Sequence, residues 1–189
     1  MTKKLFIFIF FFSLPLFSQK GIWGRITTSE VKPNKIASRQ SFPAEYTLYS
    51  VSVDEIKNSL KQSPERLKSN FSNVIISIPN SEGNLERFQM FEFSNFAPEL
   101  QAQFPEIRSY VGHGLDDKTA IVRLSLDPRG IQTMVFRVGK SNEFMEPYSQ
   151  DGKVYAVYAS KSDRKGKLPF TCSTDDQELI SSIESKTNF

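Results

Sequence analysis

The sequence contains one histidine, His113, three residues ahead of two acids, Asp116 and Asp117, in the stretch Gly-His-Gly-Leu-Asp-Asp. An imidazole that reaches a carboxylate can move protons in catalysis. A single histidine cannot supply a zinc site of several imidazoles, and no His-Glu-x-x-His, Gly-rich phosphate loop or Gly-x-Ser-x-Gly sequence occurs. We therefore interpret Gly112-His113-Gly114 as a tight bend before a strand, with both acids facing solvent.

Charged side chains elsewhere give no catalytic pattern. Any fold brings carboxylates together, so the sequence does not exclude a glycosidase-type pair of acids. No particular pair of acids is indicated. Arg123, Arg129 and Arg137 lie near aromatic residues and could form a basic binding face. Because they fall on predicted strands, the simpler expectation is that they occupy the solvent-facing side of a sheet. An independent hydrolase would have no residues that we can name.

Cys172 is the only cysteine, so the chain can form no internal disulfide. A thiolate binds Zn²⁺ at about 2.3 Å and can fill the fourth position of a catalytic zinc, where it displaces the hydrolytic water. In that role Cys172 would hold a partner protease inactive. A free thiol on an exposed segment is the alternative, and the residues alone leave both open.

Residues 1–18 have the parts of a secretory signal peptide. Lys3 and Lys4 form a basic start, residues 5–12 are an apolar run, and Ser18 is a small residue suited to cleavage before Gln19. The run is shorter than the roughly 20 apolar residues of a transmembrane helix, and an uncleaved anchor helix is the alternative. We expect a secreted or cell-surface protein.

The charge that remains after cleavage is close to neutral. The signal segment carries two lysines and no acid, so its removal lowers the excess of basic over acidic residues from three to one. We therefore expect no nucleic-acid partner, and no membrane partner once the signal peptide is removed.

Residues 19–44 mix polar residues, Gly and Pro, and predict an extended arm with at most one short strand. Residues 45–159 alternate apolar and polar side chains and predict an α+β domain, an antiparallel β-sheet meander with one or two short helices packed on one face. The helices are expected at residues 53–62, with Ser52 and Glu55 as a capping box, and from Pro98 to before Pro105. The strands are expected at residues 45–51, 74–78, 85–93, 120–126, 132–138, 144–149 and 153–159.

Two strands carry finer expectations. Residues 85–93 have apolar side chains on both faces, which predicts a bulge or two covered faces. In the strand over 132–138, Met134, Phe136 and Val138 share one face. From Ser160 the alternation stops, and residues 160–189 predict an exposed linker in which Arg164, Lys165 and Lys167 offer a processing site.

The stretch from Glu86 to Phe136 resembles the propeptide region of secreted bacterial reprolysin-like (M12B, metzincin) zinc metallopeptidases. The resemblance rests on an ordered set: Arg-Phe before a strand, Met- and Phe-rich residues, Ala-Pro-Glu-Leu, Pro-Glu-Ile-Arg-Ser-Tyr, Gly-x-Gly-x-Asp-Asp and Leu-x-Pro-Arg-Gly. It extends more weakly over residues 46–158. Pro-Phe-Thr-Cys-Ser-Thr around Cys172 departs from the Pro-Arg-Cys-Gly type of cysteine switch.

The resemblance implies a non-catalytic pro-domain that assists the folding of a zinc metallopeptidase and keeps it latent until cleavage. The chain itself would then be no enzyme and hold no cofactor, and the zinc would belong to the partner, a catalytic domain that follows in the same chain in the family. Residues 160–189 would be the linker and truncated start of the missing protease region, so the chain would be a truncated precursor or fragment.

A free-standing secreted binding or adhesion module is the alternative. Its ligand face would use the strand tyrosines, which are more commonly half-buried in sheets; these are Tyr46, Tyr49, Tyr148, Tyr155 and Tyr158.

Overall fold

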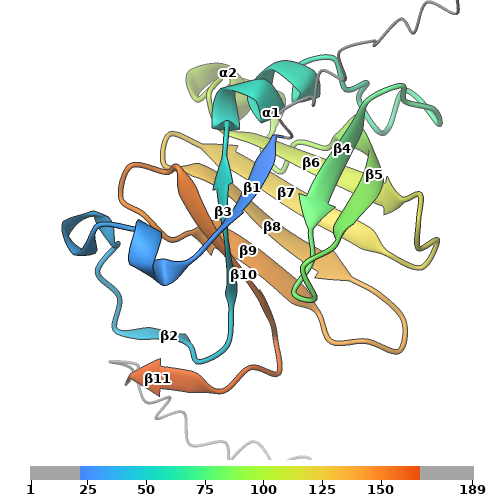
Figure 1. Cartoon of the computed structure of the whole chain (residues 1–189). Coiled ribbons are helices and arrows are strands. Elements are labelled where there is room, and N and C mark those ends of the chain that lie inside the picture. Colours follow the sequence, from blue (N-terminus) through green and yellow to red (C-terminus); the bar gives the residue numbers. More distant parts are fainter. Residues whose placement is uncertain (1–21, 167–189) are drawn as a thin grey trace, which may run out of the picture.

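The computed structural model describes residues 22–166, which form one nine-stranded antiparallel sheet with a two-stranded sheet beside it (Figure 1). The α+β prediction with an antiparallel sheet is confirmed. The order across the large sheet is β1-β3-β10-β9-β8-β7-β6-β5-β4, so β4 to β10 form a meander. The strands are β1 (Trp23–Ile26), β3 (Thr47–Val51), β4 (Ile75–Pro79), β5 (Leu85–Glu92), β6 (Arg108–Gly114), β7 (Ile121–Asp127), β8 (Gly130–Phe136), β9 (Glu143–Pro147) and β10 (Val154–Ala159).

The large sheet curls until its two edge strands approach each other. The indole Nε1 of Trp23 in β1 donates a hydrogen bond of 2.6 Å to the backbone oxygen of Ser77 in β4, although these strands are at opposite ends of the strand order. The main core fills the concave side, and its largest fully buried members include Phe88, Met90 and Tyr155. Burial of these side chains supplies most of the driving force for the curl.

Helix α1 (Val53–Leu60) covers one open end of the curled sheet (Figure 1). Ile56 and Leu60, one helical turn apart, are both completely buried in the core. The helix is two residues shorter than expected, and Ser52 makes no side-chain cap bond, so the predicted capping box does not form. The second helix, α2 (Pro98–Gln103), begins at its proline as expected and lies at the same end.

The predicted bend at Gly112-His113-Gly114 is wrong, because these residues lie inside β6. Neither glycine has a positive φ, so no turn requires them. A Cβ on Gly112 would instead lie 2.5 Å from Sδ of Met90 and 2.7 Å from Cγ1 of Val122. The glycines therefore allow neighbouring groups to approach β6 on the concave side, the other common reason for glycine in a strand.

The arm at residues 19–44 and the start of the predicted linker pack together. Within residues 22–44 the chain forms β1, two 3₁₀ turns (Thr28–Glu30 and Pro33–Lys35) and β2 (Ser41–Pro43). Strand β11 (Arg164–Gly166) pairs antiparallel with β2, and the backbone N–H of Ala44 donates to Asp163 O at 2.6 Å. Residues 164–166 are thus a strand paired with the arm.

Candidate functional site

Among the ion-paired residues that the structure describes, Arg137 has the most buried side chain, at 3% exposed. It directly follows β8 and continues the buried series of that strand, Ile131, Thr133 and Val135. Its Nη1 lies 2.9 Å from Glu86 of β5 and 3.7 Å from Asp117, and its Nη2 pairs with Glu143 of β9. We call these four residues the Arg137 cluster.

The loop between β4 and β5 is attached to the Arg137 cluster by further hydrogen bonds. The backbone N–H of Ser81 donates to Oε1 of Glu143 at 2.7 Å, and the Ser81 hydroxyl donates to the same oxygen. Nδ2 of Asn80 donates to Glu86 at 2.8 Å. The cluster therefore links β5, β9, the end of β8 and two loops at the open end of the sheet.

Electrostatics keep Arg137 charged in this buried position. Burial acts to lower the pKa of Arg137, but the hydrogen bond to Glu86 and the negative charges of Glu143, Glu86 and Asp117 outweigh it, so the pKa is raised above its ordinary value. A permanently charged guanidinium whose partners are carboxylates serves to hold the loops together. It provides no nucleophile or titratable acid–base pair.

The expectation that the arginines line the solvated side of the sheet is wrong for Arg137. Arg129 is in solvent, 80% exposed and paired with Asp127 at 2.8 Å, but it lies in the turn between β7 and β8 and not on a strand. Arg123 is also exposed, with its guanidinium carbon 5.0 Å from the ring centre of Phe93. Arg137 is buried, unlike the other two arginines, because it lies two residues after Val135 on the inward-facing side of β8.

The structure does not combine His113 with the two acids that follow it. His113 makes an edge contact with the Phe91 ring, and burial, followed by the charges of Arg66 and Arg123, lowers its pKa. Asp116 instead pairs with Arg87 at 2.6 Å.

Asp117 accepts hydrogen bonds from the backbone and hydroxyl of Thr119 and lies beside Arg137. Asp116 is exposed, as expected, and Asp117 is half-buried, and both acids make structural contacts. Within residues 22–166 no three His, Cys, Asp or Glu side chains are grouped so that they could hold a metal ion.

The tyrosines do not form an exposed ligand face. Tyr49, Tyr148, Tyr155 and Tyr158 are buried, and Tyr46 is half-buried. The hydroxyl of Tyr155 accepts the backbone N–H of Ile131 at 3.2 Å inside the core. Burial, and to a smaller extent the neighbouring Tyr46, raise the pKa of Tyr148 to about 12. These side chains hold the sheet together.

Four of the predicted site residues lie outside the described residues: Ser18, Gln19, Lys167 and Cys172. Arg164 and Lys165 of the predicted processing site lie in β11, with both residues exposed. The Arg164 guanidinium donates to the Ser41 hydroxyl at 3.0 Å. A processing protease would therefore reach these side chains from solvent but must separate β11 from β2 to bind the backbone.

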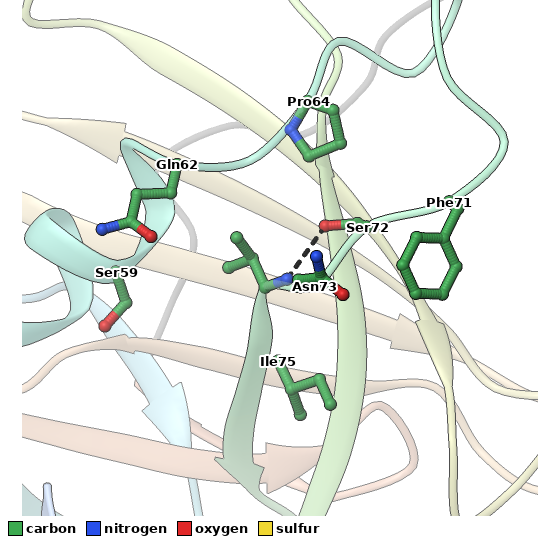
Figure 2. A pocket seen from close by; sticks show the side chains of 8 residues that line it. Ser59, Gln62, Pro64, Phe71, Ser72, Asn73 and Ile75 are labelled. Atoms are coloured by element: carbon green, nitrogen blue, oxygen red, sulfur yellow. Dashed lines mark hydrogen bonds between the residues drawn. The ribbon is translucent and has the colours of Figure 1, made fainter.

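A cavity of about 550 Å³ lies where β4 begins (Figure 2). Ser59 and Gln62 at the end of α1 lie on one side of it, and Phe71 lies on the other side of the start of β4. Phe71 is 64% exposed and Ile75 is 51% exposed. We call this cavity the β4 pocket; none of its lining residues is charged, and they are Ser59, Gln62, Pro64, Phe71, Ser72, Asn73, Val74 and Ile75.

The sequence gives only indirect signs of the β4 pocket. Phe71 follows a polar stretch, and Ile75 is part of a β-branched run that predicts a buried strand. Ile75 is exposed because its side chain lies on the face of β4 opposite to Ile76 and Ile78, which are buried in the main core.

Comparisons with family models, with curated proteins and with solved structures find no match to this chain. In the part of the chain that the structure describes, no helix has the length and apolar character needed to cross a membrane.

Proposed function

We propose that this domain acts by binding a protein, as the non-catalytic pro-domain of a secreted zinc metallopeptidase. The observation that carries the proposal is the β4 pocket, where Phe71 and Ile75 are exposed together beside an edge strand. An aromatic and an aliphatic side chain around an uncharged cavity suit a protein contact, because apolar burial drives most protein association.

The position of the basic residues supports the pro-domain form of this function. Arg164 and Lys165 are exposed at the last strand of the described domain, after the sheet is complete. Cleavage there would separate the folded domain from whatever follows it. Under this proposal the domain folds first, binds the metallopeptidase and is released by cleavage at this segment.

The test adds the protein from Gln19 to Phe189 to the isolated catalytic domain of a reprolysin-like zinc metallopeptidase and measures peptide hydrolysis. Increasing amounts should inhibit hydrolysis, and prior trypsin cleavage at Arg164 or Lys165 should weaken the inhibition. Hydrolysis unchanged at every ratio, with no complex in size-exclusion chromatography, would refute the pro-domain function. The adhesion-module function would then be the better account.

Cys172→Ser separates the two readings of the cysteine in the same assay. If the thiolate ligates zinc, the serine variant should inhibit at least tenfold less well, because a hydroxyl is a much poorer zinc ligand. Equal inhibition would assign Cys172 as a free thiol and leave the pro-domain function intact.

A further inference from the structure

We propose that the beginning of β4 receives an extended peptide segment of a protein partner as an added strand, with an apolar side chain of that segment in the β4 pocket. The inference rests on the proposed protein-binding function and specifies its mode. The mode follows from the hydrogen-bonding groups on the free edge of β4 and from the chemistry of the pocket beside them.

The ladder between β4 and β5 determines which backbone groups face the free edge. The N–H of Met90 donates to the oxygen of Val74 at 2.8 Å, and the register places Ile75 opposite Gln89. Because bonded and non-bonded pairs alternate in an antiparallel ladder, Val74 turns its oxygen toward β5, while its N–H donates to the Ser72 hydroxyl at 3.1 Å. Ile75, the first residue of the strand, therefore turns its N–H and C=O away from β5. The oxygen of Ser77, two residues after Ile75, also faces away from β5. It accepts a hydrogen bond from Trp23, which lies outside the β4–β5 pair.

Within residues 22–166, the later part of the β4 edge is protected and no backbone hydrogen bond covers the first part. Trp23 covers the edge at Ser77, and Pro79 ends the strand with a residue that has no N–H. Both are devices that prevent strand pairing at exposed edges. Asn73 and Ile75, in contrast, line the β4 pocket. The unprotected part of the edge thus lines the cavity, and exposed Phe71 contributes to the lining from the other side of the start of β4 (Figure 2).

The chemistry of this place selects an extended peptide as its occupant. Alternating N–H and C=O groups at a two-residue spacing are matched by the backbone of another strand. The uncharged lining of the β4 pocket, with Phe71 and Ile75 exposed, favours an apolar side chain over a charged one. An added strand places alternate side chains on one face, so one of them can enter the pocket while its backbone pairs with β4.

The experiment selects binders from a phage-displayed library of linear peptides on the protein from Gln19 to Phe189. Peptides with an apolar residue between β-forming neighbours should be enriched. Their affinity should fall at least tenfold on Phe71→Ala and on Ile75→Pro. The proline removes only an N–H that faces the free edge, so the β4–β5 ladder remains. Phe136→Ala is the matched control, because Phe136 is another exposed phenylalanine, 39% exposed on β8, and should leave binding unchanged.

Three results would overturn the inference: no enriched peptide, equal binding to wild type and to Phe71→Ala, or an equal loss with Phe136→Ala. Sedimentation of the protein alone tests a second copy as the occupant; a dimer that Ile75→Pro abolishes would replace the peptide. If Ile75→Pro fails to fold by circular dichroism, Phe71→Ala decides the question.

The metallopeptidase assay keeps this inference separate from the proposed function. Inhibition that Phe71→Ala and Phe136→Ala leave equally intact would refute strand addition and retain the pro-domain. Peptide binding that depends on Phe71, without any inhibition of the metallopeptidase, would retain strand addition and refute the pro-domain.

Discussion

Replacement of Arg137 by methionine should lower the free energy of unfolding by about 3–5 kcal/mol. Methionine retains an unbranched apolar stem but removes the guanidinium from the Arg137 cluster. Glu143, whose side chain is 9% exposed, and the partly buried Glu86 would then be carboxylates without their counter-charge. The cost arises from these two uncompensated charges more than from the lost attraction. Urea unfolding with linear extrapolation measures the change.

Arg129→Met is the matched control for this variant. Arg129 has the same side chain and is likewise ion-paired, with Asp127, but it is mostly in solvent. Its removal should cost less than about 1 kcal/mol, because water and ions screen an exposed pair. If the two variants lose equal stability, or if Arg137→Met stays within about 1 kcal/mol of wild type, burial of the Arg137 cluster does not have the assigned consequence.

A double variant identifies the source of the loss. Glu143→Gln removes one of the charges that Arg137→Met leaves uncompensated, so the two substitutions together should cost less than the sum of the single changes. Additive losses would mean that Arg137 stabilises the fold through contacts other than the one with Glu143.

Two further predictions use the same unfolding measurements. Gly112→Ala should lower the free energy of unfolding by about 1–3 kcal/mol, because its Cβ would lie 2.5 Å from Sδ of Met90; an unchanged urea midpoint would contradict this. Hydrogen bonds from Ser149 and Lys35 lower the pKa of Asp151 from 3.8 to about 2. Because the folded pKa is the lower one, this contribution to stability is present above pH 3.8 and is lost as the pH falls toward 2. Asp151→Asn should therefore weaken the acid dependence of the melting temperature in that range, and an identical dependence in both proteins would refute it.

Local patterns predicted most of the strands and both helices. Alternation located β7 correctly, and the two-sided apolar pattern of residues 85–93 is explained by two covered faces. Met90 faces the main core, while Phe91 lies under Arg66 on the other face, 5.4 Å from its guanidinium carbon. These features depend on neighbours close in the chain or on one adjacent strand, so the residue types carry the information.

The incorrect or missing predictions concern contacts between distant strands. Gly112 suggested a bend because a sequence cannot show that Met90 and Val122 approach it from both neighbouring strands. Arg137 suggested a solvated side chain because its carboxylates come from separate segments, one of them about fifty residues away. In β8, Met134 and Phe136 share a face as expected, but the structure buries the opposite face most completely, with Ile131 fully enclosed.

The Arg137 cluster and the β4 pocket lie at opposite ends of β4 and have different physical roles. A strand that accepts a further strand must itself be fixed, and β4 is fixed by its ladder with β5 and by the loop after Pro79. That loop is attached to the Arg137 cluster through Asn80 and Ser81. Loss of peptide binding at unchanged stability, as expected for Phe71→Ala, therefore reports recognition at the edge. Loss of both together, as expected when Arg137 is removed, reports the support that keeps the edge in position.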